Sequence, residues 1–190
     1  FLKKVELQKG IDDLQFFEIN KRTNAEDIPS FLSAASEGKN IGVLSEAGCP
    51  GVADPGGEVV KLAHKKNIRV IPLIGPSSIL LALMASGMNG QNFAFIGYLP
   101  REKSDRRRKI KYLEQFSKTH QQTQIFIETP FRNNHILDDL HTYCDKETQI
   151  VVACDITLET QYIKRLSAKD WKKEKVCLHK RPCIFMLHKY

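Results

Sequence analysis

A glycine-rich loop between Leu44 and Gly57 is the segment whose residue types point most clearly to ligand chemistry. Its sequence, LSEAGCPGVADPGG, holds four glycines and two prolines. Glycine lets a ligand approach the backbone closely, and proline keeps a loop rigid. A second small-residue loop, IGPSS at 74–78, follows the next apolar run. Ligands of open parallel sheets bind outside the carboxyl ends of the strands, so we expect these two loops to form one crevice.

The absence of two common motifs limits the classes of ligand that this crevice could bind. The sequence has no G-x-x-x-x-G-K-[ST] motif and no G-x-G-x-x-G motif that opens a helix. A nucleoside triphosphate or a dinucleotide is therefore poorly supported. A tight connection without function is the other interpretation of the loop, but its length favours a function.

Metal binding is not expected from the cysteines and histidines. The five cysteines include no C-x-x-C pair, and the six histidines show no spacing typical of metal ligands. Small buried hydrophobic side chains in a reducing compartment are the better interpretation of the cysteines.

Helix and strand patterns alternate with short loops, which is typical of an α/β fold with parallel strands. The first part of the chain has four apolar runs that predict strands. A T-N-A-E capping box at 23–26 predicts a helix that ends near Gly38, and two further helices are expected before residue 90. The expected strands are 14–19, 41–45, 68–73 and 93–96, and the two further helices are 58–66 and 77–86.

The composition becomes charged after about residue 97, so we place a domain boundary near residue 100. The predicted domains are an N-terminal α/β domain at 1–99, with a mainly parallel sheet that is incomplete at its N-terminus, and a C-terminal α/β domain at 100–190, with a smaller mixed sheet and helices. Helices are expected at 104–120 and 133–143, and strands at 124–128, 149–154, 158–165 and 183–189.

The whole net charge of +7 lies in residues 161–190, and a second basic cluster lies within residues 1–160, which are neutral overall. Residues 161–190 hold nine Lys or Arg against two Asp or Glu, and the run REKSDRRRKIK at 101–111 holds seven against two. Such clusters suit a polyanion, and a solvated helix face is an equally good interpretation. The sequence has neither an apolar run long enough for a membrane span nor the features of a signal peptide, so we expect a cytoplasmic protein.

Four motifs in register, SEAGCPGVADPG, IRVIPLIGPSS, GYLP and IETPFR, resemble the tetrapyrrole methylase family of S-adenosylmethionine-dependent methyltransferases. The resemblance is strongest to the branch that methylates ribose hydroxyls of small-subunit ribosomal RNA, and it runs from about Ile41 to Asp155. It implies two α/β domains with the methyl donor in the cleft between them, usually in a homodimer. The family segments that resemble P-T-P-I-G-N-L and E-D-T-R are expected to precede Phe1.

The same resemblance assigns residues to the donor, S-adenosyl-L-methionine, which is held mainly by backbone groups. Arg132 is expected to pair with Glu128 or to contact an acidic substrate, and we prefer the ion pair. The expected donor-binding residues are Ser45, Glu46, Ala47, Gly48, Cys49, Pro76, Ser77, Ser78, Glu128, Thr129, Ala153 and Thr157. The expected substrate-binding residues are Arg132 and the basic-run residues Arg106, Arg107 and Arg108.

A sulfonium donor is already activated, so the protein mainly has to position it and to exclude water. A ribose hydroxyl acceptor would benefit from a general base within hydrogen-bond reach. Glu46, Asp54 and Asp155 are the candidates, although carboxylates in such loops more often cap helices or tie turns.

The sequence departs from the ribosomal branch at several positions. Glu46 and Cys49 stand where that branch has Asp and Thr, and its A-R-E-L-T-K reads A-C-D-I-T-L at 153–158. Two charges near the site are thereby lost, which puts the RNA target in question. Three hypotheses therefore stay open: a methyltransferase that acts on a ribose of ribosomal RNA, one that acts on a tetrapyrrole ring, and an inactive relative that binds the donor or RNA.

Overall fold

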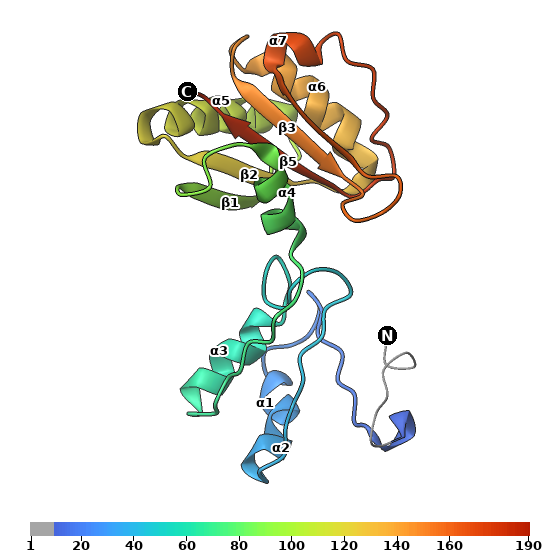
Figure 1. Cartoon of the computed structure of the whole chain (residues 1–190). Helices are drawn as coiled ribbons and strands as arrows, with labels where there is room; N and C mark the ends of the chain where they lie inside the picture. Colours follow the sequence, from blue (N-terminus) through green and yellow to red (C-terminus); the bar gives the residue numbers. More distant parts are fainter. Residues whose placement is uncertain (1–9) are drawn as a thin grey trace. The chain divides into compact units, whose positions relative to one another are not determined.

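The structure, a computed structural model, describes residues 10–190, and its contacts divide the chain between Gly75 and Pro76 into two compact units (Figure 1). This division differs from the boundary expected near residue 100. The reason is that the strand Phe93–Tyr98, which we placed in the first domain, pairs with Thr123–Ile127 of the second unit. The change in composition near residue 97 marks where a charged segment begins. It does not mark a domain boundary, because strand pairing decides which unit a segment belongs to.

The described part of the first unit is built from short helices. They are η2 (Ile11–Asp13), α1 (Ile28–Phe31), α2 (Ser33–Ser36) and α3 (Gly57–Lys65). The prediction of α3 is confirmed. The helix expected from the capping box begins only at Ile28, because the Thr23 hydroxyl accepts a hydrogen bond from the Asn20 N–H at 2.9 Å instead of capping the helix. A small apolar cluster forms the core of this unit, with residues from α1, from the junction of α1 and α2, and from α3: Ile28, Leu32, Val59 and Ala63.

The strands expected at 14–19, 41–45 and 68–73 are not formed, so the prediction of a parallel sheet is wrong for residues 10–75. Their apolar composition is typical of buried strands, but a strand exists only when its backbone pairs with a neighbour. None of the three segments has such a partner within the described residues. In keeping with this, Leu44, Ile71 and Leu73 remain exposed.

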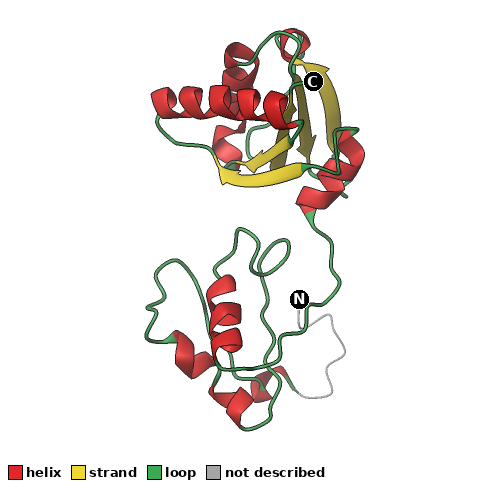
Figure 2. Cartoon of the chain, turned by 90° about the vertical axis from the view of Figure 1, so that its left-hand side faces the viewer, coloured by secondary structure: helices red, strands yellow, loops and turns green. Residues whose placement is uncertain are grey.

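The second unit contains one five-stranded mixed sheet with the order β1-β2-β5-β3-β4. β1 and β2 are parallel, whereas β5 is antiparallel to β2 and β3, and β3 is antiparallel to β4. Figure 2 shows these strands in yellow, all of them in this unit. The mixed sheet expected from the sequence is therefore confirmed. The strands are β1 (Phe93–Tyr98), β2 (Thr123–Ile127), β3 (Gln149–Cys154), β4 (Tyr162–Ser167) and β5 (Cys183–His188).

Helices cover both faces of this sheet. Successive residues of a strand point to opposite sides, and the apolar residues on both sides pack against helices. Phe126 packs into a cluster with residues of α5, α6 and α7, whereas its neighbour Ile125 packs into a cluster with Ala82 and Leu83 of α4. α4 ends at Gly87, which takes the expected left-handed conformation with φ 62°. The helices are α4 (Ser78–Ser86), α5 (Lys103–His120), α6 (Asn133–Tyr143) and α7 (Ala168–Trp171), with a 3-10 turn η3 (Pro130–Arg132) before α6.

Arg106 of the basic run lies inside the second unit and connects α5 to α6. Its Nε donates to Asp139 Oδ2 at 2.6 Å, and its Nη1 donates to the Arg101 carbonyl at 2.6 Å. Both side chains of the pair are about nine-tenths buried, at 8% and 10% exposure. Arg106 lies one turn before the buried Ile110, so the helical period turns it toward the core.

Replacement of Asp139 should therefore destabilise the second unit strongly. Asp139→Ala leaves the Arg106 charge buried without a partner, and we expect a loss of about 3–5 kcal/mol in the free energy of unfolding. Urea titration followed by Trp171 fluorescence measures this. Trp171 is the single tryptophan, and it is buried in the second unit, where it donates to the Ile150 carbonyl.

The adjacent Asp138 provides a matched control. Its side chain is 69% exposed and pairs only with His141. Asp138→Ala should change the unfolding free energy by no more than about 0.5 kcal/mol. Equal effects of the two substitutions would contradict the assignment of Arg106 as a buried structural residue.

Candidate functional site

The motifs of the second unit emerge at one edge of the sheet. Tyr98 of β1 is in register with Ile127 of β2, Ile127 with Ile184 of β5, and Ile184 with Ala153 of β3. Ala153 in turn is in register with Ile163 of β4. The carboxyl ends of β1, β2 and β3 therefore lie side by side with the amino ends of β5 and β4. We call this edge the carboxyl edge.

Three sequence motifs follow the strands at the carboxyl edge. The GYLP motif closes β1, the segment Glu128–Arg132 follows β2, and the segment Asp155–Thr157 follows β3. Motifs far apart in the sequence are brought together because β1 and β2 are parallel while β3 runs antiparallel to the intervening β5. The carboxyl edge is therefore the candidate functional site of this unit.

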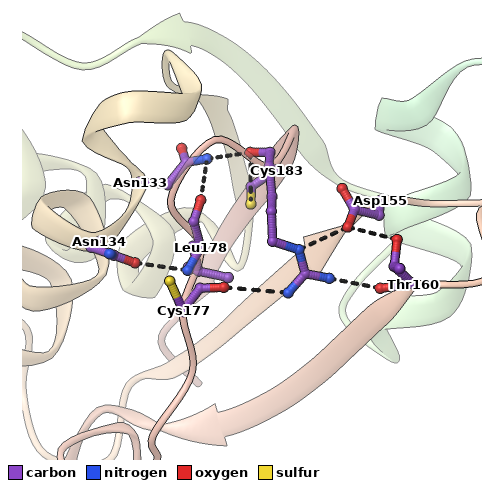
Figure 3. A network of polar contacts seen from close by, with 8 residues as sticks. Asn133, Asn134, Asp155, Thr160, Cys177, Leu178 and Cys183 are labelled. Carbon is purple, nitrogen blue, oxygen red and sulfur yellow. Dashed lines mark hydrogen bonds and ion pairs between the residues drawn. The ribbon is translucent and has the colours of Figure 1, made fainter.

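An ion pair between Asp155 and Arg181 closes this edge (Figure 3). Asp155 Oδ2 accepts hydrogen bonds from Arg181 Nε at 2.7 Å and from the Thr160 hydroxyl at 3.0 Å. Arg181 Nη2 donates to the Thr160 carbonyl at 2.6 Å, and Nη1 donates to the Cys177 carbonyl at 3.3 Å. One guanidinium thus fixes the turn after β3 to the chain that enters β5.

These contacts favour a positioning role for Asp155 over the role of general base. Burial by itself raises the pKa of the Asp155 carboxyl, but the hydrogen bonds from Arg181 and Thr160 and the Arg181 charge lower this pKa below its ordinary value. A carboxylate with a lowered pKa and two donors on one oxygen is a poor proton acceptor.

Two asparagines at the start of α6, neither of which was predicted from the sequence, complete the network. Asn133 Nδ2 donates to the Arg181 carbonyl at 2.6 Å, and Asn134 Oδ1 accepts from the Leu178 N–H at 2.8 Å (Figure 3). Asn133 is fully buried. The only signal in the sequence is their position directly after the PFR motif, since amides near a helix start commonly bind backbone groups.

Glu128 and Arg132 form the ion pair that was preferred from the sequence. Glu128 is buried, and its Oε2 lies 3.1 Å from Arg132 Nη2. Its other oxygen, Oε1, accepts from the Thr129 N–H at 2.7 Å. Thr129 itself is exposed. The charges of the motif therefore neutralise each other, and the exposed groups it presents are neutral.

Ala153 and Thr157, the two residues expected near the donor at the end of β3, differ in their exposure to solvent. Ala153 is completely buried in the cluster beneath α4. Thr157 is exposed, takes a left-handed conformation with φ 73°, and donates its N–H to Gln161 Oε1 at 2.8 Å. A contact with a ligand is therefore accessible at Thr157, whereas Ala153 contributes to the packing behind it.

In the first unit, Asp54 organises the glycine-rich loop. Its Oδ1 accepts from the N–H groups of Gly51 at 3.1 Å and Gly56 at 2.8 Å, and its Oδ2 lies 2.9 Å from the Ser45 hydroxyl. Partial burial raises the pKa of the Asp54 carboxyl, but these three hydrogen bonds lower it overall. Asp54 thus ties a turn, which was the alternative to its role as a base.

Glycine is required at three positions of this loop for two reasons. Gly48 and Gly51 have φ 73° and 79°, which side chains disfavour. At Gly56 an added Cβ would lie 2.8 Å from Asp54 Oδ1 and 3.0 Å from Val43 Cγ1. Glu46 and Ala47 are exposed at the loop tip, while Ser45 and Cys49 are half-buried.

The second small-residue loop falls at the division of the chain. Pro76 begins the second unit, and Ser77 precedes α4, with its carbonyl accepting from the Leu81 N–H at 2.9 Å. Ser78 is the first residue of α4. The convergence of this loop with Ser45–Cys49 on one ligand stays a prediction.

The three arginines of the basic run separate into two groups. Arg106 points into the unit, as described above. Arg107 and Arg108 are exposed and line an open hollow together with Ser104 and Lys111. Arg107 lies over the Tyr143 ring, 5.5 Å from its centroid, and Arg108 pairs with Asp105. Arg106 is therefore removed from the set of candidate substrate contacts.

Among residues 10–190, no group of three or more His, Cys, Asp or Glu side chains is arranged to hold a metal ion. In the same residues, the structure contains no helix with the length and apolar character that a membrane crossing requires.

Comparison with protein families gives one match. The family model of the tetrapyrrole (corrin/porphyrin) methylases matches residues 6–171. This range includes the glycine-rich loop and all motifs of the carboxyl edge.

Several curated proteins similar to the chain carry the same name. The ribosomal RNA small subunit methyltransferase I of Halalkalibacterium halodurans is 38% identical over 127 residues, which are 67% of this chain and 42% of that protein. The protein of the same name from Buchnera aphidicola is 32% identical over 172 residues, which are 89% of this chain and 59% of that protein. The chain spans about half the length of the curated relatives it matches.

Solved structures confirm the α/β fold. The crystal structure of the methyltransferase CobJ aligns with a TM-score of 0.64 at 16% identity, covering 98% of this chain and 79% of that one. Uroporphyrin-III C-methyl transferase from Thermus thermophilus, in a structure complexed with S-adenyl homocysteine, aligns with a TM-score of 0.50 at 17% identity and covers 86% of this chain and 73% of that one.

The Asp155–Arg181 pair predicts a pH-dependent stability of the second unit. Because folding lowers the pKa of Asp155, its contribution is complete above the ordinary value of 3.8 and is lost as the pH falls through the lowered pKa. Asp155→Asn should therefore lower the unfolding free energy by about 2 kcal/mol at neutral pH, and its difference from the wild type should shrink below pH 3.8. Urea titrations with Trp171 fluorescence at several pH values measure the difference.

Glu159→Gln is the matched control, since Glu159 is an exposed carboxylate of the same turn. It should leave stability unchanged at every pH. A difference between Asp155→Asn and the wild type that stays constant through acidification would refute the ion pair as the source of stability.

Proposed function

This chain belongs to the tetrapyrrole (corrin/porphyrin) methylase family, and we propose that it carries out S-adenosylmethionine-dependent methylation of a ribose hydroxyl of ribosomal RNA. Relatives named ribosomal RNA small subunit methyltransferase I, at 38% and 32% identity, support this acceptor. The observation that carries the proposal is the convergence of three family motifs at the carboxyl edge.

The residues at the carboxyl edge fit a donor that is held mainly by backbone. Gly97, at the end of β1, has φ 76°, and an added Cβ there would meet no atom within 4 Å. Thr157 adds an exposed hydroxyl, whereas the N–H and hydroxyl of the exposed Thr129 both donate to Glu128 Oε1. The nearby charges are paired within the protein. Arg132 and Arg181 are each neutralised by a carboxylate, so neither would repel a cationic sulfonium compound. We keep Ser45–Cys49, Pro76–Ser78, Glu128, Thr129 and Thr157 as the proposed donor contacts, with Ala153 behind them.

The bound donor supplies an activated methyl group, so the work of the protein is to orient the two reactants and to exclude water. Methylation of a hydroxyl releases its proton, which a base or the solvent must accept. The hydrogen bonds of Asp54 and Asp155 argue against both as that base. Glu46, exposed in the glycine-rich loop, remains the proposed candidate.

The exposed cations of α5 support an RNA acceptor. Arg107, Arg108 and Lys111 surround one open hollow, which suits phosphate groups of a nucleic acid backbone. A tetrapyrrole acceptor is the alternative enzyme function, since the carboxylates of such a ring are also anions. An inactive relative that binds the donor or RNA is the third possibility.

Assembly, domain arrangement and location belong to the same proposal. A homodimer is supported by α4, which exposes the apolar side chains of Leu80 and Met84 at 50% and 79%. Donor binding between two domains and a cytoplasmic location also stay proposals, in keeping with the family resemblance.

Two measurements test the proposed function. Calorimetry with S-adenosylmethionine should show binding, and methyl transfer from radiolabelled donor should label small-subunit ribosomal RNA but not a tetrapyrrole. Donor binding with transfer only to the tetrapyrrole would favour the alternative enzyme. Donor or RNA binding without any transfer would favour the inactive relative, and absence of donor binding would exclude the methyltransferase.

The double substitution Arg107→Ala and Arg108→Ala should weaken RNA binding about tenfold and reduce the salt dependence of the affinity by about one phosphate contact per arginine. Fluorescence anisotropy of labelled RNA at several salt concentrations measures both effects.

The control is Lys118→Ala, because Lys118 is an exposed cation at the other end of α5. It should leave the salt dependence nearly unchanged. If Lys118→Ala lowers the RNA affinity as much as each arginine substitution does, RNA is attracted by the overall positive charge of the protein. The assignment of a local RNA contact to Arg107 and Arg108 then fails.

A further inference from the structure

Phe131 and His179 form an exposed aromatic pair at the carboxyl edge. Phe131, in η3 between β2 and α6, is 64% exposed. Its nearest ring is that of His179, which comes from the segment between α7 and β5. The ring centroids are 5.8 Å apart and the planes meet at 70°, so the two rings pack edge to face. Phe131 is therefore held at one side by His179 while most of the residue stays open to solvent.

Backbone and side-chain hydrogen bonds fix the two segments that carry these rings. The Lys180 N–H donates to the Pro130 carbonyl at 3.1 Å, which ties the residues adjacent to both rings. Asn133 and Asn134 bind the Arg181 carbonyl and the Leu178 N–H on either side of His179 and Lys180 (Figure 3). The rings are thus presented by anchored segments, which lowers the entropy cost of binding to them.

Three cations are close neighbours of the two rings in the sequence: Arg132, Lys180 and Arg181. Arg132 and Arg181 are paired with Glu128 and Asp155, but Lys180, next to His179, is exposed and forms no ion pair with any residue of 10–190. An open aromatic ring beside an unpaired cation matches a nucleotide, which has a flat base and an anionic phosphate.

We propose that the Phe131 ring, with His179 packed against it, is a stacking platform for one unpaired base of a single-stranded RNA, with Lys180 beside the phosphate of that nucleotide. This inference rests on the proposed function. Sequence-tolerant stacking on aromatic side chains is the usual way in which proteins bind unpaired bases. The platform lies directly after Thr129 at the carboxyl edge, so a base held there would place its nucleotide at the proposed donor wall.

A single ring pair suits a nucleotide better than a protein partner. Protein interfaces need a contiguous apolar patch of several hundred Å², whereas one ring covers one base. A tetrapyrrole ring would also stack on Phe131, and the experiment below separates it from RNA.

The experiment uses the full protein and a short single-stranded RNA that contains 2-aminopurine, whose fluorescence falls when the base stacks. Phe131→Ala should weaken RNA binding about tenfold, abolish the fluorescence decrease and leave the salt dependence unchanged. Phe131→Tyr should keep both properties because it keeps the ring. Phe131→Leu, which is apolar without an aromatic face, should behave as Phe131→Ala does.

Two controls separate stacking from damage to the fold or to donor binding. Tyr112→Ala removes another exposed ring with a lysine over it and should leave the affinity unchanged. Donor binding by calorimetry and the urea midpoint from Trp171 fluorescence should be the same for Phe131→Ala as for the wild type.

The outcomes distinguish this inference from the proposed function. If the wild type methylates RNA but Phe131→Ala binds RNA as tightly and quenches 2-aminopurine as strongly, the platform is refuted and the function stands. Base stacking is refuted if Phe131→Leu retains the quenching. It is also refuted if Phe131→Ala weakens the binding of a tetrapyrrole but not the binding of RNA. A wild type that binds the donor but neither binds nor methylates RNA overturns both.

Discussion

The Asp155–Arg181 ion pair is the interaction on which the carboxyl edge of the second unit depends. The guanidinium binds the carboxylate after β3, the Thr160 carbonyl before β4 and the Cys177 carbonyl before β5. The Arg181 carbonyl is bound in turn by Asn133 of α6. Three strands and a helix therefore meet at one residue. Because Asp155 is buried, loss of its partner would leave a charge that the surrounding structure cannot solvate.

The pairing of charges within the protein also determines which groups this edge presents to a ligand. Glu128 is paired with Arg132 and Asp155 with Arg181, so the buried carboxylates are used for positioning. What remains exposed is neutral backbone, the Thr157 hydroxyl and an aromatic ring at Phe131. Positive charge is displaced to the surrounding surface, on α5 and on Lys180. A neutral wall with cations around it suits a reaction in which a cationic donor and a polyanionic acceptor must both be bound.

Much of the second unit was predictable from sequence, because helical period and apolar runs are local signals. α6 and β3 were predicted with their observed bounds, and the period that places Arg106 above Ile110 was present in the sequence although we read the arginine as exposed. Nonlocal contacts were not predictable. The strands expected at 41–45 and 68–73 need partners that no local pattern supplies, and the partners Asp155 and Arg181 are 26 residues apart in the chain. Asn133 was missed for the same reason, since its acceptor is 48 residues away.

The central claim is that the carboxyl edge of the second unit forms a wall of the donor site. Amide hydrogen exchange with and without S-adenosylhomocysteine tests it most directly, because the claim concerns backbone groups. We predict that the ligand slows exchange in segments 97–99, 128–132 and 155–157, with little change in α7. Binding of the ligand, measured by calorimetry, together with unchanged exchange in all three segments would contradict the account.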